Sequence, residues 1–156
     1  MNSNKSVLLV DDGENDLVLL RIALGRAGFR GPIREARGGQ EAMAYLGGSG
    51  VYADRKKYLL PTFMLLDLNM PKVSGFELLA WVRAQEDAIL KNLPIVILSA
   101  SMRALDMDRA LELGANSFLV KPGTLDGLVE MMRGLDEWLG SRRFPSVGEI
   151  LRYPGA

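Results

Sequence analysis

The stretch Phe63-Met64-Leu65-Leu66-Asp67-Leu68-Asn69-Met70-Pro71 decides the fold, because four consecutive apolar residues run directly into an aspartate and a turn. An apolar run without polar alternation is typical of a strand that is buried on both faces of a parallel sheet. Three further runs repeat the pattern, and each is followed, or ended, by polar residues: Val7-Leu8-Leu9-Val10 by Asp11-Asp12, Ile95-Val96-Ile97-Leu98 by Ser99, and Phe118-Leu119-Val120 by Lys121-Pro122.

Between these runs lie segments of helical periodicity, at about 14–27, 39–46, 103–113 and 125–139. The sequence Ser74-Gly75-Phe76-Glu77 is typical of a capping box that begins another helix, with Phe76, Leu79 and Val82 facing inward. A weaker alternating segment, 33–37, follows Pro32 and is typical of an edge strand. Five strand–helix alternations predict an α/β fold: a flavodoxin-like, doubly wound, five-stranded parallel sheet of order 2-1-3-4-5 with five helices.

Length and composition narrow the function. The chain has 156 residues, which predicts one domain over 1–139 and a tail over 140–156 without a separate output domain. Nineteen basic residues balance nineteen acidic ones, so charge gives no sign of nucleic-acid or membrane binding. There is no cysteine and no histidine, so any metal should be a hard ion held by oxygen. Without a signal peptide or spanning segment, the chain is expected in the cytoplasm.

The polar residues that follow the strands should meet at one edge of the sheet, because parallel strands end together. Three carboxylates (Asp11, Asp12 and Asp67) would repel there by about 4 kcal/mol for each close pair at an effective dielectric constant near 20. A divalent cation relieves this repulsion, and a site with few protein ligands suits Mg²⁺. Beside Mg²⁺ and Lys121, Asp67 is a good acceptor for a phosphoryl group, and the Ser99 hydroxyl can donate to the product.

These four motifs (Leu9-Val10-Asp11-Asp12, Leu65 to Pro71, Leu98-Ser99-Ala100 and Val120-Lys121-Pro122) resemble the receiver domain of bacterial two-component response regulators over residues 5–139. The resemblance implies that Asp67 is the phosphoacceptor and that Asp11, Asp12, Asp67 and the Asn69 backbone carbonyl hold the metal. It implies that Ser99 and Lys121 bind the phosphoryl group, that Ser99 and Phe118 form a conformational switch, and that the Lys121–Pro122 bond is cis. The implied partners are a sensor histidine kinase and an unidentified downstream protein, and homodimerisation is left open.

Two departures from the family pattern stand out. Gly123 occupies the position after the Lys-Pro pair where the family usually has phenylalanine, and residues 47–60 form a long connection. That connection, with Glu41-Ala42-Met43-Ala44-Tyr45-Leu46, is similar to stand-alone receivers that are partnered with phytochrome-type histidine kinases.

Plainer interpretations exist for each motif taken alone: a helix cap for Asp11-Asp12, turn chemistry for Asp67, and a surface charge for Lys121. Their coincidence at four strand ends favours the phosphoacceptor. Two alternative functions remain. One is a phosphatase of the haloacid dehalogenase type, which is disfavoured because Asn69 stands where that class has an acidic residue. The other is a scaffold that works without phosphorylation, which is disfavoured because every matched polar position is filled.

Overall fold

The sheet of the computed structural model, which describes residues 5–141, has the predicted order β2-β1-β3-β4-β5 and is parallel throughout. Its strands are β1 (Val7–Val10), β2 (Ile33–Ala36), β3 (Phe63–Leu66), β4 (Ile95–Ser99) and β5 (Ser117–Val120). Val10 pairs with Leu66, and Ser99 pairs with Val120. This register makes the strands end at one edge, and the residues after them therefore become neighbours.

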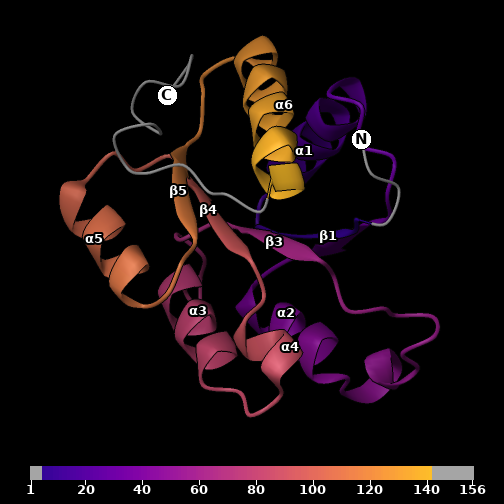
Figure 1. Cartoon of the computed structure of the whole chain (residues 1–156). Coiled ribbons are helices and arrows are strands. Elements are labelled where there is room, and N and C mark those ends of the chain that lie inside the picture. Colours follow the sequence, from indigo (N-terminus) through magenta and orange to yellow (C-terminus); the bar gives the residue numbers. More distant parts are fainter. Residues whose placement is uncertain (1–4, 142–156) are drawn as a thin grey trace.

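Helices cover both faces of the sheet (Figure 1). Helices α1 (Glu14–Arg26) and α6 (Leu125–Ser141) pack together on one face, whereas α2 (Gly39–Gly47), α3 (Gly75–Arg83) and α5 (Ala104–Glu112) cover the other. These are the five predicted helices. A short α4 (Ala88–Lys91) was not predicted, because it is a single turn, capped by the Asp87 carboxylate, and is too short to show a periodicity.

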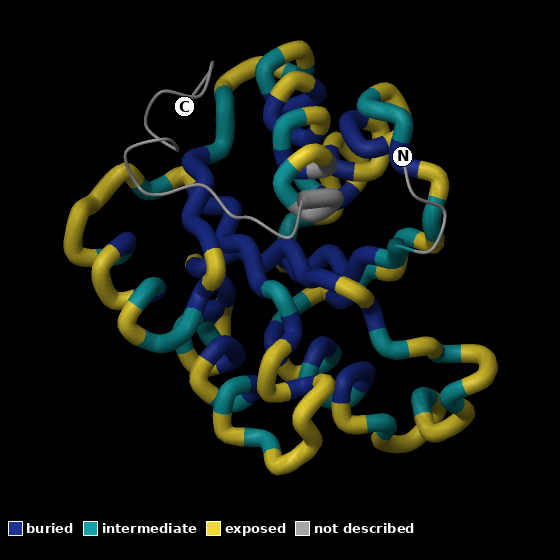
Figure 2. Tube along the Cα trace, viewed as in Figure 1, coloured by how far each residue is buried: buried dark blue, intermediate teal, exposed yellow. Residues whose placement is uncertain are grey.

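The core lies between the helical layers and the central strands (Figure 2). Every residue of β1, β3, β4 and β5 is buried, as the unbroken apolar runs predict, whereas only Ala36 is buried in the edge strand β2. The predicted cap of α3 is confirmed, because the Ser74 hydroxyl accepts a hydrogen bond from the Glu77 backbone N–H. Phe76 was predicted to point inward but is only half-buried, and Leu78 is buried instead.

The long connection 47–60 folds back onto α2 through a 3₁₀ turn, η1 (Gly50–Ala53). The ring of Tyr52 lies 5.1 Å from those of Tyr45 and Tyr58, centroid to centroid. The Arg55 guanidinium donates hydrogen bonds to the carbonyls of Tyr45, Leu46 and Tyr58. Aromatic packing and one arginine therefore hold this segment in place.

The described residues bear on two further predictions, one about the tail and one about membrane-spanning helices. The predicted tail falls almost entirely on 142–156, outside those residues. Among residues 5–141, no helix is both long and apolar enough to cross a membrane.

Candidate metal centre

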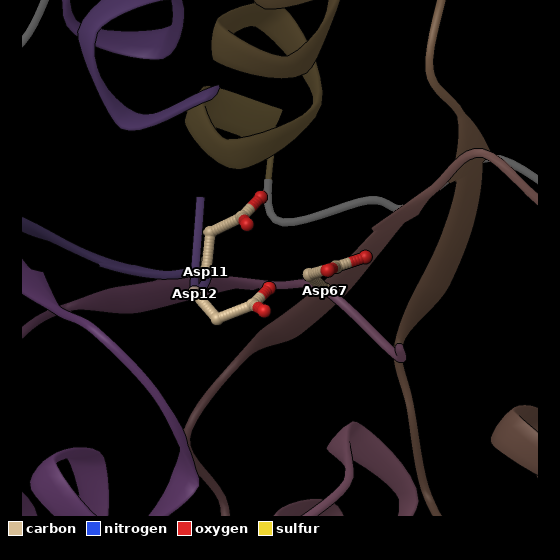
Figure 3. A group of neighbouring side chains, drawn as sticks. All are labelled: Asp11, Asp12 and Asp67. Atoms are coloured by element: carbon tan, nitrogen blue, oxygen red, sulfur yellow. The ribbon is translucent and has the colours of Figure 1, made fainter. Parts of the chain in front are cut away.

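Three carboxylates converge where β1 and β3 end (Figure 3). Asp11 and Asp12 follow β1, Asp67 follows β3, and one carboxylate oxygen from each lies within 4.8 Å of the others. Asp11 is 2% exposed and Asp67 9% exposed, whereas Asp12 is open to solvent. The cluster that the sequence predicts is therefore present, with two buried members and one side facing water.

Lys121, at the end of β5, reaches into the same cluster. Its Nζ lies 3.0 Å from Asp11 Oδ2 and 3.8 Å from Asp67 Oδ1. The other oxygen of Asp11, Oδ1, accepts a hydrogen bond of 2.9 Å from the Gly13 backbone N–H. Asp11 is thus held in place from both sides, and Lys121 is shared between two buried carboxylates.

Burial and the neighbouring charges shift the pKa values of both Asp67 and Lys121. Burial raises the pKa of Asp67 from 3.8 to about 6; Asp11 and Asp12 add to the rise, and Lys121 and the Asn69 backbone N–H oppose it. Burial lowers the pKa of Lys121, but its hydrogen bond to Asp11 and the charge of Asp67 outweigh this, so the net change is upward. Lys121 therefore stays charged, but its charge does not offset the full cost of ionising the buried Asp67 carboxyl.

The donor set fits a hard divalent cation. The three side chains offer carboxylate oxygens as ligands, and the solvent-facing side at Asp12 leaves room for water ligands. One fixed positive charge cannot balance three carboxylates, and a divalent ion supplies the remainder. Asp11, Asp12 and Asp67 therefore form a divalent metal site.

The remaining predicted residues occupy distinct places around this site. Ser99 is fully buried at the end of β4, and its carbonyl accepts a 2.7 Å hydrogen bond from the Lys121 backbone N–H. Its hydroxyl accepts from the Ser101 N–H at 3.1 Å. Phe118 is fully buried on β5. Asn69 is exposed.

The predicted cis bond between Lys121 and Pro122 is wrong for this structure, because no cis peptide bond occurs among the described residues. The trans form is the intrinsically favoured isomer of an X–Pro bond. With it, the Lys121 side chain still reaches Asp11 and its backbone still pairs with Ser99.

Two residues of the site were not predicted from the sequence. Asp16, in the first turn of α1, places its Oδ2 3.7 Å from Lys121 Nζ and adds a fourth carboxylate. Gly75 begins α3 so close to Asp67 that an added Cβ would lie 2.3 Å from the Asp67 carbonyl oxygen. One sequence signal could have predicted Asp16: it comes four residues after Asp12, in the first turn of the following helix.

The comparisons with known proteins agree with this geometry. Residues 7–133 match the response regulator receiver domain. The chain is 35% identical to the probable methanogenesis regulatory protein FilR2 of Methanothrix harundinacea, over 89% of this chain and 86% of that protein. It is 34% identical to response regulator Rcp1 of Synechocystis, over 93% of this chain and 96% of that protein.

Solved structures extend the likeness to three dimensions. The phosphorylated cyanobacterial phytochrome response regulator RcpA superposes with a TM-score of 0.79 at 35% identity, covering 91% of this chain and 99% of that one. The Mn²⁺-bound form of Rcp1 gives 0.77 at 34% identity, with the same coverage. The chain therefore belongs to the response regulator receiver family, whose domain is a phosphoacceptor switch rather than a true enzyme.

Proposed function

We propose that the chain accepts a phosphoryl group from a sensor histidine kinase on Asp67, in a reaction that requires Mg²⁺. The observation that carries the proposal is the meeting of three carboxylates within 4.8 Å beside Lys121. Of the two buried carboxylates, Asp11 already accepts hydrogen bonds from Lys121 and the Gly13 backbone N–H. Asp67 lies 3.8 Å from Lys121 Nζ without such a hydrogen bond, which leaves its oxygen for bond formation.

Each residue has a role in this scheme. Asp11, Asp12, Asp67 and the Asn69 carbonyl would hold Mg²⁺, which supplies positive charge to the phosphoryl oxygens. An Asp67 oxygen forms a bond to phosphorus as the P–N bond of the donor phosphohistidine breaks, and the imidazole keeps that electron pair. Lys121 moves its hydrogen bond from Asp11 to a phosphoryl oxygen, which by then carries more charge.

The switch begins at Ser99. The Ser99 hydroxyl accepts a hydrogen bond from the Ser101 N–H, and its own proton would donate to a phosphoryl oxygen on Asp67. Phe118, fully buried on the neighbouring strand β5, would repack when Ser99 moves toward the phosphoryl group. The proposed consequence is a changed surface around α5 and β5, which a downstream protein reads.

The wider setting is also proposed. Three similar solved structures are named as phytochrome or bacteriophytochrome response regulators, and these names support a phytochrome-type kinase as the donor. The receiver unit would comprise residues 1–139, with residues 140–156 as a tail. The protein would act in the cytoplasm and reach its targets by protein contact. Whether it also self-associates is open to test.

The test uses acetyl phosphate as a small donor. With Mg²⁺ the wild-type chain should gain one phosphoryl group by intact mass, and Asp67→Asn should gain none. Autophosphorylated kinases of the source organism are then offered one at a time. Equal labelling of wild type and Asp67→Asn would disprove the assignment of Asp67, and labelling by acetyl phosphate but by no kinase would disprove the donor.

A further inference from the structure

An apolar groove crosses the amino edge of the sheet, where the strands begin, and the metal centre lies at the opposite edge. Four of its lining residues immediately precede a strand: Ser6 before β1, Pro32 before β2, Thr62 before β3 and Pro94 before β4. Leu59, from the long connection 47–60, and Ile89, from α4, form further walls. A cavity of roughly 150 Å³ already accepts benzene, so this volume of about 730 Å³ has room for several apolar side chains.

The polar groups that line this groove already have partners. The Ser6 backbone N–H donates to Thr62 Oγ1 at 2.9 Å, and the Thr62 hydroxyl donates to the Ser6 carbonyl at 2.8 Å. Arg55, which also lines the groove, donates from its guanidinium to three backbone carbonyls. A polar ligand would have to displace these hydrogen bonds, whereas apolar side chains would leave them intact. The groove therefore suits an apolar occupant.

The walls of the groove expose two large aliphatic side chains. Leu59 is 61% exposed and Ile89 is 66% exposed. Single exposed apolar residues are common on protein surfaces, but two of them on the walls of one concave surface form a patch that is stabilised when an apolar partner covers it. The groove therefore offers a binding surface to an apolar segment.

Helix α6 leads the chain to the same edge of the sheet. It begins beyond the carboxyl end of β5 and packs beside α1, which itself runs back to the amino edge to reach β2. The 17 residues of α6 extend about 26 Å, whereas a four-residue strand such as β5 extends about 13 Å. The helix is therefore long enough to bring Ser141 to the amino edge. Residues 142–156, outside the described part of the chain, continue from there.

We propose that residues 147–153 of the same chain dock in this groove and cover its exposed walls. Val147, Ile150 and Leu151 recur at the spacing of one helical face, so all three can meet one surface. Residues 142–146 can span about 17 Å when extended, which exceeds the roughly 10 Å between packed layers. The proposal does not depend on phosphorylation, because the groove and the metal centre lie at opposite edges of the sheet.

The covalent tether favours this occupant over the alternatives. A segment linked by a short connector has an effective concentration in the millimolar range at its site. A second copy of the chain or a separate protein reaches that concentration only in concentrated samples, and it also loses translational and rotational freedom on binding. The chain's own segment therefore occupies the groove as long as its intrinsic dissociation constant is below millimolar.

The test is a double-mutant cycle in the full chain, followed by urea denaturation. Ile89→Asp places a charge on the wall of the groove, and Ile150→Asp places one in the docking segment. Val51→Asp, at a residue that is 74% exposed and does not line the groove, is the control for both. Circular dichroism confirms that each variant is folded, and a synthetic peptide of residues 142–156 is titrated into each full-length chain.

We expect Ile89→Asp and Ile150→Asp each to raise the equilibrium constant for unfolding by about tenfold, the loss of one buried apolar contact. Together they should raise it by about tenfold as well, because either one alone already releases the segment. Val51→Asp should change it by less than about twofold, and its effect should add to that of Ile150→Asp. The peptide should bind Ile150→Asp, whose groove is vacated, with a dissociation constant below millimolar, and should not bind Ile89→Asp.

Other occupants give different results. Additive effects of Ile89→Asp and Ile150→Asp, or no binding of the peptide to Ile150→Asp, would overturn the proposal. If the sedimentation coefficient of wild type rises with concentration and Ile89→Asp abolishes the rise, a second copy fills the groove and the proposal is wrong. If neither substitution changes unfolding, the segment does not dock and the groove is left for a separate protein, which also overturns it.

Discussion

Replacing Asp67 by asparagine should stabilise the metal-free protein, although it removes the proposed acceptor. The carboxyl of Asp67 has a pKa of about 6 in the fold against 3.8 ordinarily, with burial as the main cause. A raised carboxyl pKa means that the folded state binds the proton more tightly than the unfolded chain does. Ionised Asp67 therefore lowers the free energy of unfolding above pH 6, and this cost disappears below pH 3.8.

The size of the effect follows from the difference of about two pKa units. At 1.36 kcal/mol per unit, the ionised carboxyl costs about 3 kcal/mol at pH 7.5, an upper value because the solvent-facing side of the site reduces the desolvation of Asp67. At pH 5, where Asp67 is mostly protonated in the fold, the same linkage leaves roughly half of the cost. For a chain of this length, 3 kcal/mol corresponds to a rise in melting temperature of about 6–12 °C.

The assay is urea denaturation of wild type and Asp67→Asn in EDTA at pH 7.5 and at pH 5, repeated with 10 mM Mg²⁺ at pH 7.5. We expect the variant to be more stable in EDTA, its advantage to fall by about half at pH 5, and Mg²⁺ to narrow the gap by stabilising wild type more. Asp108→Asn, an exposed carboxylate outside the site, is the control and should show none of these trends. A variant that is less stable than wild type in EDTA at pH 7.5 would refute the electrostatic reasoning.

Two further predictions concern how the site and its surroundings are built. Gly75→Ala should lower the free energy of unfolding by about 1–3 kcal/mol and slow labelling by acetyl phosphate, because the new Cβ would press on the Asp67 carbonyl. The control Gly25→Ala should be neutral or stabilising, and equal effects of the two variants in urea denaturation would contradict the role of Gly75. Arg55→Ala should cost about 1–3 kcal/mol and speed hydrogen exchange in residues 47–60, because three carbonyls lose their donor. Unchanged exchange relative to Lys56→Ala, a matched exposed cation, would count against that role for Arg55.

The sheet and most of the carboxylate site could be predicted from the sequence because both depend on short local patterns. A continuous apolar run such as Phe63–Leu66 signals a buried parallel strand, and the residue after it must lie at the sheet edge. Asp67 and Lys121 are therefore placed by topology alone. The paired register of Val10 with Leu66 then brings Asp11 beside Asp67.

Other features depend on distances between elements, which the sequence does not encode locally. Asp16 reaches Lys121 only because the first turn of α1 lies beside the end of β5. Gly75 is needed only because α3 starts against the Asp67 carbonyl. The isomer of the Lys121–Pro122 bond was inferred from resemblance alone, and α4 is too short to leave a periodic trace.

The most direct test of the central claim is chemical trapping of the acyl phosphate. Reduction with borohydride after treatment with acetyl phosphate converts a phosphorylated aspartate to homoserine, which peptide mass spectrometry locates. The account predicts homoserine at position 67 when Mg²⁺ is present and none when EDTA replaces it. Homoserine at Asp11 or Asp12, or at position 67 regardless of metal, would contradict the claim that these three carboxylates form a metal-dependent phosphoacceptor.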